Sequence, residues 1–381
     1  MNGSGRQEIW QRLLGLESHD TVKIRFKRIH ARKLSARRAG EINATARQAR
    51  EYFRNANAAD YSVRPLLTFY GIACLGRALT LLMKPNGGEE GLTSGHGLES
   101  LGWRNLMGGS IDAGLQNLYN LKIRRRTGLF SDFLIHTRNT TLLHQRSSAV
   151  NGHCPYGKPD LEAEILLGDL FSRTPDLSPD YASVGVPQYV SVSEFSFNAK
   201  KGLEMKLTGD RASDIARAYQ DVGYAVSVDD TRVLITCESS TVLKEPPMFV
   251  HAYMQNTMRP IPIPDLHLAV PFDGGVRFSQ LCIIYMMSYI LGMLVRYFPT
   301  HWIALINGGK GDLLWPTINR AQQYVENTFP ELVAEYVTFS MDNPAEVGKD
   351  PAKECPSKRD ANGHCAEDTA KSCLGSNAGS Q

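Results

Sequence analysis

Residues 65–83 have the sequence PLLTFYGIACLGRALTLLM, and apolar residues fall on nearly every side of the helix that they predict. Pro65 stands at the first helical position, where its missing N–H is tolerated. The residues that follow, Lys84-Pro85-Asn86-Gly87-Gly88, are a stop signal. Because a helix without a polar face is stable only in an interior, we expect this one inside a helical bundle.

A second apolar stretch, 281–295, ends at Arg296 and predicts a helix over 278–297. Its length is short of the ~20 residues that cross a bilayer, so we expect a buried core helix and no membrane partner. Apolar residues at helical spacing predict further helices at 7–16, 43–55, 130–144, 161–171 and 315–328.

The pattern changes after residue 186, because residues 189–197 alternate with a period of two, as in a half-buried strand. Strands at 202–207, 224–228 and 232–236 and a helix at 212–222 complete a small α+β unit. The predicted fold is therefore mainly α with an α+β insert. Its expected parts are a basic helical region (1–150), a linker-like segment (151–185), the α+β subdomain (186–240), a helical region packing on the first (241–340) and a disordered tail (341–381).

The composition predicts an intracellular protein whose fold is stable without disulfides or bound metals. Hydrophobic residues make up 42% of the chain, which is enough for a core without disulfides or metals. The N-terminus lacks the apolar region of a secretory signal, so we expect a cytoplasmic location. Seven scattered cysteines indicate free thiols. Three of them, Cys355, Cys365 and Cys373, lie near His364, but their spacing is not that of a zinc site, and we expect neither a metal nor a cofactor.

Positive charge is concentrated in the first 150 residues, which carry 23 Lys and Arg against 11 Asp and Glu, whereas residues 151–381 carry 19 against 28. Basic clusters attract polyanions, so RNA or DNA is a candidate partner. The alternative is a solvated basic face, or one that pairs with the protein's own acidic half. The candidate nucleic-acid-binding residues are Lys23, Arg25, Lys27, Arg28, Arg32, Lys33, Arg37, Arg38, Arg124, Arg125 and Arg126.

Arg138 and His144 form the most suggestive short motif, on the helix predicted at 130–144. The segment resembles the Arg-x(4–6)-His signature of HEPN ribonucleases, which implies that His144 moves a proton and Arg138 stabilises phosphate charge. Six residues place the two on different faces of a straight helix, so a shared site needs a helix end or a second subunit, as in a homodimer. The alternative is a surface arginine and a helix-terminal histidine.

His96 is a second candidate catalytic residue, because Gly95 and Gly97 allow the backbone to present its imidazole from a loop. The alternative is a histidine that only stabilises a turn. Phosphate loops, Gly-x-Ser-x-Gly elbows and His-Glu-x-x-His motifs do not occur in the sequence.

Three segments together resemble the YaaC-like proteins, a bacterial family. They are 64–71 (RPLLTFYG), 95–98 (GHGL) and 288–302 (SYILGMLVRYFPTHW), and the resemblance extends over about residues 40–335. It implies an architecture but no catalytic residues. From the residues themselves, we expect Arg296 to cap the second apolar helix and Trp302 to pack back on it.

Two functions are consistent with these observations. The first is an intracellular interaction or regulatory protein, favoured by the missing catalytic signatures. The second is a nucleic-acid-binding protein or HEPN-like ribonuclease, acting in defence against foreign nucleic acid, with Arg138 and His144 at its site.

Overall fold

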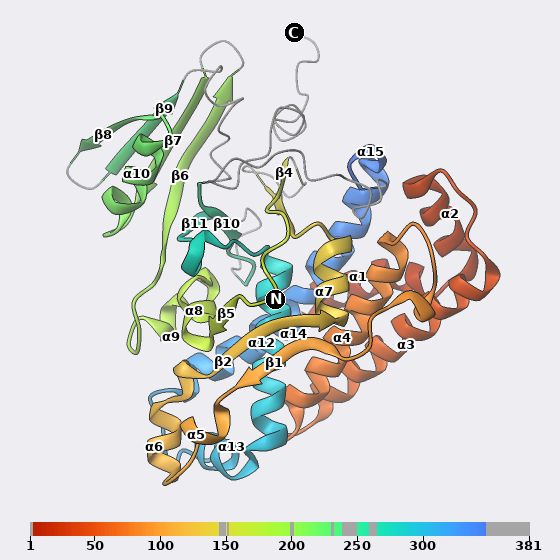
Figure 1. Cartoon of the computed structure of the whole chain (residues 1–381), viewed down its shortest axis with the longest axis horizontal. Coiled ribbons are helices and arrows are strands. Elements are labelled where there is room, and N and C mark those ends of the chain that lie inside the picture. The colour runs from red at the N-terminus through yellow and green to blue at the C-terminus, as the bar shows by residue number, and fades with distance from the viewer. Residues whose placement is uncertain are drawn as a thin grey trace. The chain divides into compact units, whose positions relative to one another are not determined.

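The computed structural model describes residues 3–144, 150, 152–198, 202–229, 232–237, 250–258 and 265–347. They divide into two compact units. Unit 1 consists of the described residues of 1–139, 157–187 and 281–347, and unit 2 of those of 140–156 and 188–280. The fold is mainly α with an α+β insert, as the sequence predicts (Figure 1).

Unit 1 is mostly helical. Its longer helices are α1 (Gly3–Leu13), α2 (His19–His30), α3 (Ala36–Ala58), α4 (Arg64–Met83), α7 (Leu129–His136), α12 (Gln280–Tyr297), α13 (Pro299–Ile306) and α14 (Trp315–Asp342). Short helices are η1 (Leu14–Leu16), η2 (Glu89–Gly91), α5 (Trp103–Leu106), α6 (Ile111–Gln116), η3 (Leu118–Asn120), α8 (Leu167–Ser172), η4 (Pro175–Leu177), α9 (Ser178–Tyr181) and α15 (Pro344–Val347).

The two apolar helices, α4 and α12, form the core of unit 1, as predicted. Both are long and apolar enough to span a membrane by composition alone, but 72% and 89% of the respective windows are buried within the protein. Glycines let the helices approach closely. A Cβ on Gly292 of α12 would lie 2.8 Å from the Phe69 Cβ of α4, and one on Gly71 would lie 2.9 Å from the Phe53 ring of α3. Larger residues at these positions would overpack the core.

Helix α14 extends well beyond the predicted end at Thr328 and continues through Pro330. A proline removes one helical hydrogen bond. The turns beyond it bury Val333, Tyr336 and Val337, which offsets that loss. We expected a disordered tail over 341–381, but its first residues belong to α14 and α15. Residues 348–381 lie outside the described residues.

A small antiparallel sheet in unit 1 has the order β1-β2-β5. Its strands are β1 (His96–Leu101), β2 (Lys122–Gly128) and β5 (Glu164–Leu166). The expected glycine-rich loop around His96 is therefore the start of a strand. The helix expected at 161–171 is likewise only half correct, since β5 precedes α8.

Unit 2 is a six-stranded antiparallel sheet, β10-β11-β6-β7-β9-β8, with helix α10 (Ala212–Asp221) on one face. Its strands are β6 (Tyr189–Asn198), β7 (Gly202–Thr208), β8 (Ala225–Asp229), β9 (Arg232–Cys237), β10 (Ala252–Gln255) and β11 (Leu266–Ala269). A two-stranded sheet, β3 (Thr140–Leu143) with β4 (Gly152–Pro155), and η6 (Asp273–Gly275) complete the unit.

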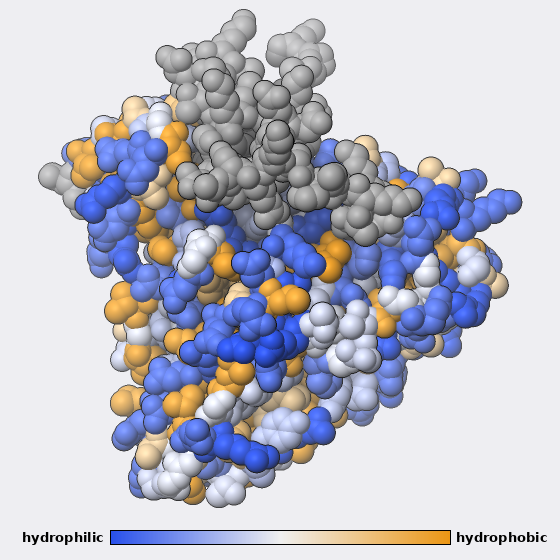
Figure 2. Space-filling view, in the orientation of Figure 1, coloured by the Kyte–Doolittle hydropathy of each residue, from blue (hydrophilic) through white to orange (hydrophobic). Residues whose placement is uncertain are grey.

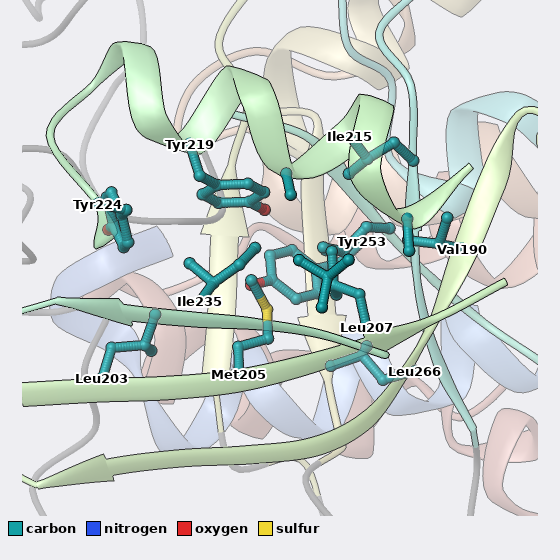
Figure 3. Close-up of a cluster of buried hydrophobic side chains, with 14 of the residues drawn as sticks. Val190, Leu203, Met205, Leu207, Ile215, Tyr219, Tyr224, Ile235, Tyr253 and Leu266 are labelled. Carbon is teal, nitrogen blue, oxygen red and sulfur yellow. The ribbon is translucent and has the colours of Figure 1, made fainter. Parts of the chain in front are cut away.

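The core of unit 2 lies between α10 and the sheet (Figure 3). Ile215 and Tyr219 of α10 face Met205, Leu207 and Ile235 of the central strands, with Tyr253 among them. These strand residues alternate with exposed or half-buried ones such as Glu204 and Lys206, so the pattern with period two places one face inward.

Candidate interaction surface of unit 1

The three segments that carry the family resemblance meet at one place in unit 1. The ring of His96, at the start of β1, lies 5.2 Å from the ring of Phe69 in α4 and 6.2 Å from that of Tyr289 in α12. The Tyr289 hydroxyl lies 3.4 Å from the Ser100 hydroxyl of β1. Residues that are far apart in the sequence therefore form one aromatic cluster.

The backbone around His96 requires its two glycines. Gly95 and Gly97 have φ values of +86° and +78°. A Cβ on Gly97 would lie 2.8 Å from the backbone nitrogen of Phe130 and 3.0 Å from the carbonyl carbon of Gly128. Only glycine fits this close approach. The presentation of His96 predicted from the sequence is thus present, but on a strand that packs against α4.

The His96 imidazole is half-buried and lacks a hydrogen bond to either ring nitrogen among the described residues. Burial lowers its pKa below the ordinary value of 6.5, and the nearby charge of Arg296 lowers that pKa further. The imidazole is therefore neutral at pH 7, when one ring nitrogen can donate a hydrogen bond and the other can accept one.

A second layer of residues lies outside this cluster, and we call it the tyrosine–arginine surface: Tyr52, Tyr70, Arg296 and Tyr297. The rings of Tyr52 and Tyr70 stack at 5.6 Å. The Arg296 guanidinium donates a hydrogen bond of 3.5 Å to the Tyr70 hydroxyl and lies 5.2 Å from the Tyr297 ring. Arg296 lies in the last turn of α12, as expected, and its guanidinium hydrogen-bonds to Tyr70 of α4 rather than to a carbonyl of its own helix.

Arg296 and Tyr297 are exposed, whereas Tyr52 and Tyr70 are half-buried. Within the part of the chain that the structure describes, Arg296 has no carboxylate partner. Tyrosine and arginine are the residue types enriched in protein interfaces, because they combine a large contact area with a polar group. The geometry therefore suits recognition of an anionic group beside an apolar one.

The nearby residues of the same family segments stabilise the fold instead. Arg64 donates hydrogen bonds of 2.7 and 2.6 Å to the buried carboxylate of Glu326, which also accepts from Thr68 and Gln322. The Trp302 indole donates to the Tyr61 carbonyl at 2.8 Å, and its ring lies 6.1 Å from that of Trp315 in α14. These contacts hold α4, α13 and α14 together.

Arg38, the most buried of the candidate phosphate ligands in α2 and α3, has a structural contact instead. Its guanidinium donates to the carbonyl oxygens of Leu81 (2.6 Å), Lys84 and Pro85 (3.3 Å) at the end of α4. Burial lowers its pKa to about 10. Arg38 thus satisfies carbonyl groups that the helix end leaves free.

Most other basic residues of this stretch also have partners within unit 1, and the surface over α2 is largely hydrophilic (Figure 2). Arg28 pairs with Asp342, and Arg37 pairs with Glu41 and Glu90. Three further contacts join Arg32 to Asn86, Arg25 to the Arg12 carbonyl and Lys23 to Asp20. Lys27 and Lys33 are exposed and lack such a partner among the described residues.

The second basic cluster is neutralised on the surface of β2. Arg124 pairs with Glu162 and Glu164, and Arg126 pairs with Glu99 and Glu162. Arg125, between them, points to the opposite face and is buried. Five of the eleven candidate residues therefore pair with the protein's own carboxylates: Lys23, Arg28, Arg37, Arg124 and Arg126. Three of these five, Arg28, Arg124 and Arg126, pair with residues of the acidic half of the sequence.

Arg138 and His144 do not lie on one helix, so the prediction of a helix over 130–144 is wrong beyond His136. Arg138 and Asn139 have φ values of +53° and +49°, which end α7, and β3 begins at Thr140, where β-branched residues favour a strand. Arg138 belongs to unit 1, whereas the buried His144 follows β3 in unit 2. The helical context of the HEPN resemblance is absent.

Groups of three or more side chains suited to a metal ion do not occur among the described residues. Cys355, His364, Cys365 and Cys373 lie outside them.

Comparison with known proteins gives one family. The family model described as YaaC-like Protein matches residues 15–337, which includes all three segments of the aromatic cluster. No curated protein and no solved structure matches the chain. The chain therefore belongs to the YaaC-like protein family.

Proposed function

We propose that this protein is a binding protein that recognises an acidic segment of a partner protein through the tyrosine–arginine surface of unit 1. The observation that carries the proposal is the state of Arg296, an exposed guanidinium held beside Tyr70 and Tyr297 without a carboxylate partner among the described residues. The other surface arginines discussed above mostly have carboxylate partners within the unit. Arg296 is therefore available to a carboxylate from another molecule.

The three tyrosines indicate which chemical groups should accompany the carboxylate in the ligand. Stacked Tyr52 and Tyr70 and exposed Tyr297 offer apolar area at low conformational entropy, with hydroxyls that accept or donate hydrogen bonds. A segment that carries Asp or Glu next to an apolar or aromatic residue matches both features. The half-buried imidazole of His96, neutral because burial lowers its pKa, can add a polar contact.

Fluorescence anisotropy with labelled 12-residue peptides tests this proposal. The peptides share a central aromatic residue and differ only in flanking Glu or Lys. We expect tighter binding of the acidic peptide, weakened at least tenfold by Arg296→Gln and less by Tyr70→Phe. The matched control is Arg54→Gln on α3, an exposed arginine that pairs with Glu51, and it should leave binding unchanged.

Equal binding of both peptides, or binding that survives Arg296→Gln, would contradict the proposal. A labelled single-stranded RNA serves as the competing probe, because tyrosines and arginine also stack on bases. RNA binding that depends on Arg296 and excludes the acidic peptide would assign the surface to nucleic acid, as the second hypothesis from the sequence holds.

A further inference from the structure

Arg125 is a buried cation without a counterion among the described residues. It lies on β2 with a side chain only 1% exposed, and its Nη1 donates to the carbonyl oxygen of Pro159. Its Nε and Nη2 atoms are buried and have no hydrogen-bond partner in the described chain. Its neighbours Arg124 and Arg126 face solvent and are paired with glutamates.

This arrangement is unfavourable unless something neutralises the guanidinium. Burial is the largest influence on the pKa of Arg125 and lowers it, while the nearby Cys282 and Asp160 side chains raise that pKa. The carboxylate of the exposed Asp160 is not within ion-pair distance of it. A buried unpaired charge is strongly unfavourable even after relaxation, so native proteins rarely keep one.

The unpartnered atoms define what would satisfy them. Nε–H and Nη2–H point in parallel from one edge of the planar group, and the two oxygens of a carboxylate match that edge. Cys282, a neighbour of Arg125, lies in the first turn of α12. The positive end of a helix dipole repels a cation and stabilises an anion. A ligand with one carboxylate would therefore neutralise the single positive charge of the guanidinium.

We propose that Arg125 binds a small monocarboxylate in the interior of unit 1, through Nε and Nη2, next to the first turn of α12. This site is independent of the tyrosine–arginine surface. Phosphate suits it less, because a phosphate group carries about −1.5 to −2 charges at pH 7 and calls for more donors than one guanidinium edge.

Thermal unfolding of the full chain in chloride buffer, with sodium acetate or inorganic phosphate added at constant ionic strength, tests the proposal. We expect saturating acetate to raise the Tm of the wild-type protein by about 5 °C. Arg125→Met should remove this shift. Arg126→Met, the exposed neighbour on the same strand, should retain it. Arg125→Lys keeps the positive charge but loses the two parallel N–H donors of the guanidinium, so it should weaken acetate binding at least tenfold. This variant tests the site if Arg125→Met does not fold.

A carboxylate that remains bound through purification would mask the shift, so acid-denatured protein is also analysed by NMR for released carboxylate. About one equivalent from the wild type and none from Arg125→Met supports the site. If the wild type releases no carboxylate and acetate does not shift its Tm, the proposal is overturned. Equal acetate shifts in the wild type and Arg125→Met would also overturn it. A shift with phosphate alone would overturn the monocarboxylate. If Asp160→Asn destabilises the protein in chloride as much as Arg125→Met, Asp160 is the counterion and the proposal fails.

Discussion

The guanidinium of Arg64 and the carboxylate of Glu326 form a bidentate ion pair between α4 and α14, with N–O distances of 2.7 and 2.6 Å. Glu326 is almost fully buried, and Thr68 and Gln322 complete its hydrogen bonds. The pair therefore joins residues that are 262 positions apart in the chain.

We expect Arg64→Met to destabilise unit 1 by about 3–5 kcal/mol, because it leaves the Glu326 carboxylate buried and uncompensated. The double variant Arg64→Met/Glu326→Met should lose much less, since it buries no unpaired charge. Urea unfolding followed by tryptophan fluorescence measures both. A double variant as unstable as the single one would contradict this explanation.

Gly97→Ala should destabilise the protein by about 3 kcal/mol, because the new Cβ meets the backbone at Phe130 and Gly128 and the φ value of +78° is strained. Gly95→Ala is the matched control. Its φ is +86°, but a Cβ there meets nothing within 4 Å, so we expect a loss of only ~1–2 kcal/mol. Thermal unfolding separates the two, and equal losses would show that contact with the backbone does not matter.

Tyr253→Phe should leave the stability of unit 2 unchanged or raise it, because the Tyr253 hydroxyl is buried without a hydrogen-bond partner in the described chain. Tyr156→Phe should instead cost about 1–3 kcal/mol, since the Tyr156 hydroxyl accepts a 2.8 Å hydrogen bond from the Tyr253 backbone N–H. Chemical denaturation followed by circular dichroism compares them. A larger loss in Tyr253→Phe would contradict the assignment of these hydroxyls.

His251 should make the stability of unit 2 sensitive to acid. Burial lowers its pKa to about 4, although its Nε2 donates to the Ile215 carbonyl at 3.2 Å. An unfolded histidine has a pKa of about 6.5, so the unfolded state binds more protons between the two values. The contribution of His251 is therefore complete above pH 6.5 and is lost as the pH falls toward 4.

An NMR titration of the His251 imidazole checks the pKa directly. In parallel, His251→Gln should flatten the fall of Tm between pH 6.5 and 4 relative to the wild type. A slope that the variant does not change would assign the acid sensitivity to other groups.

The elements that the sequence predicts well are those decided by burial alone. Helices α4 and α12 are apolar on most sides, and β6 alternates with period two, so each pattern has one physical solution. The pattern of charges, in contrast, predicts the structure only in part. Sequence spacing cannot show that Glu162 and Glu164 lie across from Arg124 and Arg126, because that pairing is set by the sheet register.

The elements that the sequence misses depend on contacts between distant residues. Strand β1 begins in a glycine pair that favours a loop locally, and its pairing with β2 overrides this preference. Helix α7 ends early because Arg138 and Asn139 adopt positive φ values, which no helical periodicity reveals. Of the candidate site, His96 was predicted, but Tyr70 and Arg296 could not be joined to it without the fold.

Unit 1 is assembled from three separate stretches of chain, and the last of them begins at Leu281. The apolar helix α4 leaves the ribosome ~200 residues before its partners α12 and α14 are made, a delay of roughly 10–40 s at bacterial-like synthesis rates of about 5–20 residues per second. Helix α3 precedes α4 and can already pack on it, but the apolar face of α4 that meets α12 and α14 has no native cover during that interval. Nascent chains of this protein should therefore depend on chaperones until translation is nearly finished.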